Sequence, residues 1–179
     1  LVLVHLVQER QERNVIRLYR LAALDRRCAS IKSVITNLKE VDDNPEVGRV
    51  LGQALKSDLV RIQKLDPARS NIEQEMRQSG AADKRAAKRP KSDSKTSLNS
   101  EREVIKARGH INDALALIRH LYEVRKVSGE VLESTARHLG MLSALVGVNS
   151  NIHMAEQAMA RADSKKALSH YRAAESYLL

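Results

Sequence analysis

The chain has 179 residues, an apolar share of 42% and a single cysteine, Cys28, so it cannot hold an internal disulfide and is not a disulfide-stabilised secreted domain. Its formal charge of +9 favours anionic partners, and +4 of that charge falls in residues 79–100. Helix-forming residues dominate, with four tyrosines and no Phe or Trp, so we expect an all-α fold with an aliphatic core.

The first seven residues, Leu-Val-Leu-Val-His-Leu-Val, are almost entirely aliphatic. A bilayer span takes about 20 apolar residues, so these seven match only the last part of one. Basic residues directly after a membrane segment mark its cytoplasmic side. We therefore expect four arginines to lie near lipid headgroups: Arg10, Arg13, Arg17 and Arg20. The alternative is an ordinary helix start that is buried in the fold or against a partner.

Residues 1–14 are predicted to form a juxtamembrane or stalk helix, because residues 8–14 contain no apolar side chain. Residues 15–78 are predicted to form a three-helix lobe. Its first helix carries an apolar seam whose spacings of three and four residues indicate packing against another helix: Leu21, Leu24, Cys28, Ile31, Ile35 and Leu38. This seam can close within the lobe or across a homodimer, and the sequence permits both.

The second helix of this lobe is expected to start after Pro45 and to end near Leu65. Its apolar residues fall on one side, so it should fold back on the first helix: Val47, Val50, Leu51, Ala54, Leu55, Leu59 and Ile62. A shorter third helix should turn Ile72 and Met76 inward.

Residues 79–100 are predicted to be a flexible, disordered basic linker, since one large apolar side chain, Leu98, cannot offset the entropy of ordering them. Six basic residues in it are candidates for contacting phosphates of nucleic acid or anionic lipid: Lys84, Arg85, Lys88, Arg89, Lys91 and Lys95. No aromatic residue lies among them, so base stacking is not available. The alternative is a solvated tether that its own charge keeps extended.

Residues 101–179 are predicted to form a second helical lobe. Ser100 and Glu103 have the spacing of a capping box, which indicates a helix start. Ser128-Gly129 should end that helix, and a further helix should reach Gly147. Asn149-Ser150 should then lead into a hairpin over residues 151–179.

This hairpin resembles a tetratricopeptide repeat at six positions: Ala155, Ala158, Asp163, Ala167, Tyr171 and Ala174. Ala155, Ala167 and Ala174 would let two antiparallel helices approach closely, Asp163 would sit in the tight turn, and Tyr171 would fill the space between the helices. The large aromatic expected early in the repeat and the closing proline are missing. The resemblance implies protein binding, which we place on an exposed face around Asn151, Met154 and His170.

No residue pattern points to a catalytic, cofactor or metal site. The six histidines include no pair at the i, i+4 spacing and none in a Glu-x-x-His arrangement. Cys28 falls in an apolar seam, where a thiol serves as a small apolar side chain. The scattered glycines form no phosphate-binding loop.

The predicted function is a non-enzymatic scaffold or adaptor that binds a partner protein and forms the cytoplasmic part of a membrane-anchored protein, at the inner membrane. The alternative is a soluble cytoplasmic protein that binds nucleic acid through the basic linker. A third hypothesis is an enzyme whose site is assembled from single polar residues on several helices.

Overall fold

The computed structural model describes residues 2–42, 44–77 and 96–178, with side chains from residue 8 onward. Its main helices are α1 (Val2–Leu38), α2 (Pro45–Leu65), α4 (Glu101–Glu123), α5 (Gly129–Ala160) and α6 (Ser164–Glu175). A short helix over residues 72–77 follows α2. These described residues contain no strand, which confirms the all-α prediction.

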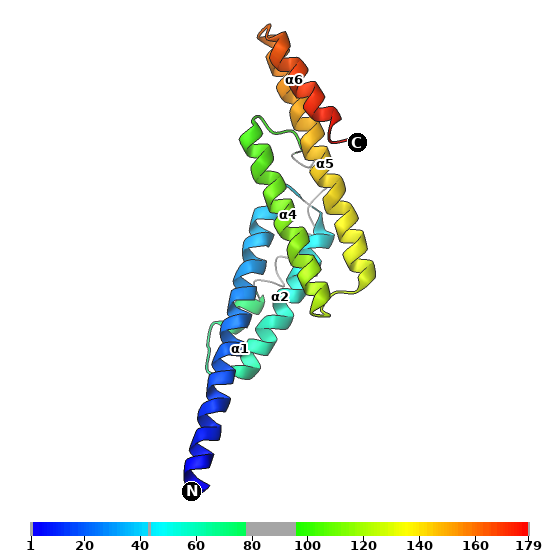
Figure 1. Ribbon diagram of the computed structural model, residues 1–179. Coiled ribbons are helices and arrows are strands. Elements are labelled where there is room, and N and C mark those ends of the chain that lie inside the picture. The colour runs from blue at the N-terminus through cyan, green and yellow to red at the C-terminus, as the bar shows by residue number, and fades with distance from the viewer. Residues whose placement is uncertain (1, 43, 78–95, 179) are drawn as a thin grey trace.

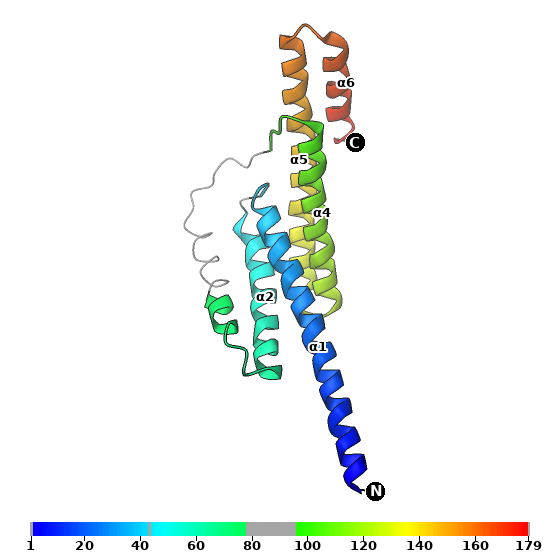
Figure 2. The ribbon, with the colours of Figure 1, turned by 90° about the vertical axis from the view of Figure 1, so that its left-hand side faces the viewer.

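The helices form an elongated bundle in which each packs on its neighbours in a simple order. Helix α1 packs on α2 and α4, α4 packs on α5, and α5 packs on α6. The N-terminal part of α1 projects from one end of the bundle, and the α5–α6 hairpin extends from the other (Figures 1 and 2).

The first half of the chain follows the sequence pattern closely. The seam of α1 is buried at Leu21, Leu24, Cys28, Ile31 and Leu38, with Ile35 partly buried beside Val34. All seven apolar residues expected on the inner side of α2 are buried, and so is Ile72. Because this burial is complete in a single chain, the α1 seam closes within the chain.

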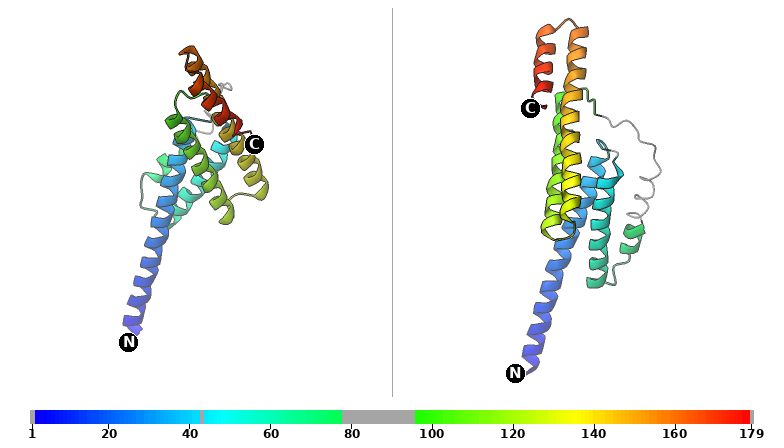
Figure 3. Two further views of the ribbon diagram at one scale, coloured as in Figure 1. Left: turned by 45° about the horizontal axis from the view of Figure 1, so that its top comes forward. Right: turned by 90° about the vertical axis from the view of Figure 1, so that its right-hand side faces the viewer.

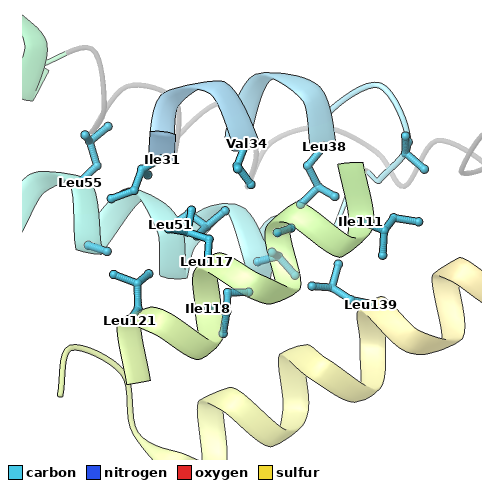
Figure 4. Close-up of a cluster of buried hydrophobic side chains, with 14 of the residues drawn as sticks. Ile31, Val34, Leu38, Leu51, Leu55, Ile111, Leu117, Ile118, Leu121 and Leu139 are labelled. Carbon is cyan, nitrogen blue, oxygen red and sulfur yellow. The ribbon is translucent and has the colours of Figure 1, made fainter. Parts of the chain in front are cut away.

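One hydrophobic cluster joins both halves of the chain. Ile31 from α1, Leu51 from α2, Ile118 from α4 and Leu139 from α5 are all fully enclosed in it (Figure 4). The predicted division into two lobes is therefore not confirmed, since α1 and α4 share this core. Most of the predicted linker, residues 79–95, lies outside the described residues.

Two helix starts follow their expected capping chemistry. At α2, the Asn44 side chain accepts a hydrogen bond from the backbone N–H of Glu46, and Pro45 occupies the first helical position. At α4, Ser100 Oγ accepts a hydrogen bond from the N–H of Glu103 at 3.3 Å. The predicted start of α4 is thus confirmed.

Helix α4 ends in a left-handed turn that directs the chain into α5. Arg125 has a positive φ of 55°, and the backbone N–H of Lys126 bonds to the carbonyl of Leu121 at 2.8 Å. This pair of features is the Schellman motif, in which glycine usually takes the left-handed position. The motif therefore fixes the backbone position of Lys126, from which its side chain extends.

The same motif closes α5. Ala162 has a φ of 59°, and the N–H of Asp163 bonds to the carbonyl of Ala158 at 2.9 Å. Asp163 then caps α6 by accepting a hydrogen bond from the N–H of Lys166. The predicted place of Asp163 in the tight turn is confirmed.

The predicted helix break between Gly147 and Asn151 is wrong, because α5 runs through it without interruption. Asn151 donates its side-chain N–H to the carbonyl of Gly147 at 2.8 Å, and Ser150 Oγ donates to the carbonyl of Thr96 at 3.1 Å. Polar side chains in this stretch therefore have hydrogen-bond partners while the helix continues, with the partner of Asn151 inside α5 and that of Ser150 outside it. Gly147 has a packing role there, since a Cβ on it would lie 2.7 Å from the ring of Tyr177.

Replacing Gly147 with alanine should destabilise the fold by about 1–3 kcal/mol, because the added methyl overlaps the Tyr177 ring. Gly140 is the matched control in the same helix, since a Cβ there meets nothing within 4 Å. Gly140→Ala should stabilise the protein by up to about 1 kcal/mol, the helix propensity difference. Urea unfolding of both variants measures this contrast, and equal shifts would contradict the close packing of Tyr177 on α5.

Candidate functional site

The three residues predicted to form a partner-binding face are buried. Asn151, Met154 and His170 are 5%, 7% and 5% exposed, and His170 Nδ1 lies 3.3 Å from Asn151 Oδ1. The expectation that they line an exposed face is therefore wrong. They lie in the interior, and Asn151 and His170 join α5 to α6.

The predicted position of Tyr171 in the α5–α6 hairpin also needs correction, because its side chain is 44% exposed. His170 lies three residues after Ala167 and four before Ala174, so these three share the buried side of α6. The three alanines expected at the contact, Ala155, Ala167 and Ala174, are buried, and Ala158 is buried as well.

The four predicted membrane-proximal arginines lie on the exposed, projecting part of α1. Arg10, Arg13, Arg17 and Arg20 follow one another at spacings of three, four and three residues, so they form one stripe along the helix. No helix in the described part of the chain is long and apolar enough to cross a bilayer. The predicted anion-contacting residues of the linker, Lys84 to Lys95, lie outside the described residues.

A buried cluster of charges joins α1, α2 and the α4–α5 connection. Asp58 of α2 has no solvent exposure. Arg27 of α1 binds its carboxylate with two hydrogen bonds, at 2.5 and 2.6 Å, and Lys126 forms an ion pair with the same group. Lys126 also lines a hollow beside this connection, together with Tyr122. No local sequence pattern indicates this cluster, because Asp58 and Lys126 are 68 residues apart.

The cluster shifts the pKa of each of its members. Burial alone would raise the pKa of Asp58, but the hydrogen bonds and charges of Arg27 and Lys126 together hold that pKa below its ordinary value. Burial lowers the pKa of Lys126, and the charges of Arg27 and Arg61 add to this effect, so the pKa stays below its ordinary value although Asp58 raises it. The hydrogen bond to Asp58 raises the pKa of Arg27. The positive charges of Arg27 and Lys126 therefore compensate the buried negative charge of Asp58.

Cys28 lies next to Arg27 in the sequence and is 4% exposed. Burial raises its pKa to about 11, and the charge of Asp58 adds to this effect. The thiol is therefore protonated at neutral pH, which matches its predicted packing role. Within the described ranges, no group of three His, Cys, Asp or Glu side chains is placed to hold a metal ion.

Replacing Asp58 with asparagine should destabilise the fold by about 3–5 kcal/mol at pH 7, because two cationic side chains lose their buried partner. The folded pKa of Asp58 lies below its ordinary value of 3.8, so its stabilising effect is present above that pH and is lost as the pH falls through the folded value. The variant should therefore lose less stability than the wild type on acidification below pH 4.

Chemical unfolding at several pH values measures both effects. Glu133→Gln provides the control, because Glu133 and Arg137 form an ion pair that is exposed to solvent. Removing this pair should leave the free energy of unfolding nearly unchanged. Parallel pH profiles for Asp58→Asn and the wild type would contradict the assigned role of the Asp58 carboxylate.

Helix α5 carries a line of exposed apolar side chains, which we call the α5 stripe: Met141, Leu145, Val148, Ile152 and Met159. Four of them are large hydrophobic residues that remain 37–58% exposed, and Val148 is half-buried. Their spacings of four, three, four and seven residues place them on one side of the helix over about 27 Å. Figure 3 shows α5 on the outside of the bundle along its whole length.

The opposite side of α5 is buried at Leu139, Leu142 and Val146. The helix is therefore apolar on two faces, although only one of them is covered in the single chain. The α5 stripe was not predicted, because the expected break after Gly147 placed Leu145 and Ile152 on two different helices. Their seven-residue separation was the signal that both lie on one continuous helix.

Comparison with known proteins does not assign the chain to a family. The chain matches no protein-family model, no curated protein and no solved structure. The candidate site is therefore defined by the exposed faces of α5 and α1 alone.

Proposed function

We propose that this protein is a non-enzymatic scaffold or adaptor that binds a helix of a partner protein along the α5 stripe. The observation that carries the proposal is an unbroken helix with one covered and one exposed apolar face. An exposed apolar line of this kind is typical of a protein-binding surface.

The spacing of the α5 stripe supports a helix as the bound element. Alternating steps of three and four residues form the narrow seam along which two helices pack side chains into each other's gaps. Gly140 and Ala144 lie beside Met141 and Leu145, and a Cβ on Gly140 would meet open space. Small side chains there leave room for the close approach of a second helix.

The proposal also places the protein on the cytoplasmic face of a membrane. Its support is the exposed arginine stripe on α1, since basic residues gather on that side of membranes. The α5 stripe and the arginine stripe are separate surfaces, because the arginines and the α5–α6 hairpin lie toward opposite ends of the molecule (Figure 2).

A photo-crosslinking residue placed at Leu145 or Ile152 should trap one partner protein in cells, whereas the same residue at Ile105 of α4 should not. Ile105 is the matched control, because it is 72% exposed and lies outside the α5 stripe. With that partner purified, Leu145→Glu combined with Ile152→Glu should weaken binding roughly hundredfold, since charges cannot enter an apolar seam. Ile105→Glu should leave the affinity unchanged.

Two results would overturn the proposal. Equal crosslinking from Leu145 and Ile105 would show that the α5 stripe has no specific partner. Crosslinks that join two copies of this chain, with Leu145→Glu converting a dimer to a monomer, would make the α5 stripe a homodimer interface instead.

A further inference from the structure

The projecting part of α1 has two different sides. Leu21 and Leu24 begin the buried seam, and Arg17 lies four residues before the first and seven before the second, so the arginine stripe continues the line of the seam. Tyr19 lies two residues from Leu21, and Val15 lies nine from Leu24. Both spacings place a side chain on the opposite side of an α-helix.

That opposite side is apolar and open to solvent. Val15, Ile16, Leu18 and Tyr19 are 50%, 51%, 60% and 73% exposed. We call these four residues the α1 apolar face. Because α2 and α4 pack on the seam side of α1 and residues 10–20 are all exposed, no other described part of the chain covers this face.

The width of the α1 apolar face indicates what covers it. Positions 15, 16, 18 and 19 span about 160° of the helix circumference, much more than the narrow seam along which two helices pack. A broad apolar face opposite an arginine-rich one is typical of helices that lie in the headgroup region of a bilayer. Tyr19 suits this place, since tyrosine is enriched at membrane–water interfaces.

The net positive charge of residues 8–27 favours binding to an anionic surface. Residues 8–27 contain six arginines and three carboxylates, a net charge of +3, and one of these carboxylates, Asp25, is paired with Arg69 at 2.7 Å. Arg26 lies seven residues after Tyr19, in line with the α1 apolar face, and is exposed. Each copy of α1 carries a net charge of +3 over this segment, so repulsion opposes the pairing of two copies through this face, whereas an anionic surface attracts it.

We infer that residues 10–26 of α1 bind the surface of an anionic phospholipid bilayer, with the α1 apolar face inserted among the headgroups and the arginines held at the phosphates. Arginine binds phosphate oxygens with two parallel hydrogen bonds, so it is suited to this contact. The inference deepens the membrane part of the proposed function. Its test does not involve the α5 stripe, so failure of either leaves the other standing.

The absence of tryptophan from the sequence allows a direct test with the whole chain. Tyr19→Trp places a single fluorescent reporter on the α1 apolar face, and Tyr171→Trp places one on α6, where the tyrosine is also exposed. Phosphatidylcholine vesicles with added phosphatidylglycerol should shift the emission of the Tyr19→Trp variant to shorter wavelength. The same vesicles should leave the emission of the Tyr171→Trp variant unchanged, and pure phosphatidylcholine should shift neither.

Further substitutions in the Tyr19→Trp variant then separate the two contributions to binding. Arg17→Gln combined with Arg26→Gln should lower the partition into anionic vesicles roughly tenfold or more, and added salt should have the same effect. Val15→Gln combined with Ile16→Gln should abolish the emission shift. Both pairs change exposed residues of a helix to a good helix former, so an unchanged circular dichroism spectrum confirms that the bundle is intact.

Three results would overturn the inference. One is the absence of any emission shift of the Tyr19→Trp variant with anionic vesicles. Another is an equal shift with neutral vesicles, which would remove the role of the arginines. The third is a shift of the same reporter on addition of an acidic helical peptide but not of vesicles, which would make a protein the occupant of the α1 apolar face.

Discussion

A carboxylate with no solvent contact holds the two halves of this chain together. Asp58 on α2 meets Arg27 of α1 and Lys126 from the connection after α4, so three segments converge on one buried charge. Such a group is tolerated only where its partners stay in place, which fixes how the later helices dock on the earlier ones. The left-handed turn at Arg125 is part of this constraint, because it positions Lys126.

Around this charge the hydrophobic cluster consists of aliphatic side chains together with Cys28 and Met154. The hydrophobic cluster runs from the seam of α1 through α2 and α4 to α5. A second polar contact joins distant parts of the chain near the N-terminal end of α2, where His138 Nε2 of α5 lies 2.9 Å from Asp42 Oδ2. Burial of aliphatic side chains stabilises the fold, and these two polar contacts between distant parts of the chain fix the positions of the helices relative to one another.

Local signals were sufficient to predict most helices but not how they meet. Pro45 and the Ser100–Glu103 pair located helix starts correctly, because capping depends on neighbours in the sequence. The continuity of α5 was missed, since Gly147 is tolerated there through its contact with Tyr177, which no local pattern reveals. The buried state of Asn151 and His170 depends likewise on a contact across a turn. The α5 stripe could have been found from spacing alone once α5 was taken as one helix.

Helix α5 connects the hairpin to the first half of the chain because it has no break. Its 32 residues form a rod of about 48 Å, of which the first part packs on α4 and the last part on α6 (Figure 1). His138, in the first third of this rod, contacts the turn between α1 and α2. One continuous helix therefore sets the distance between that turn and the α5–α6 hairpin.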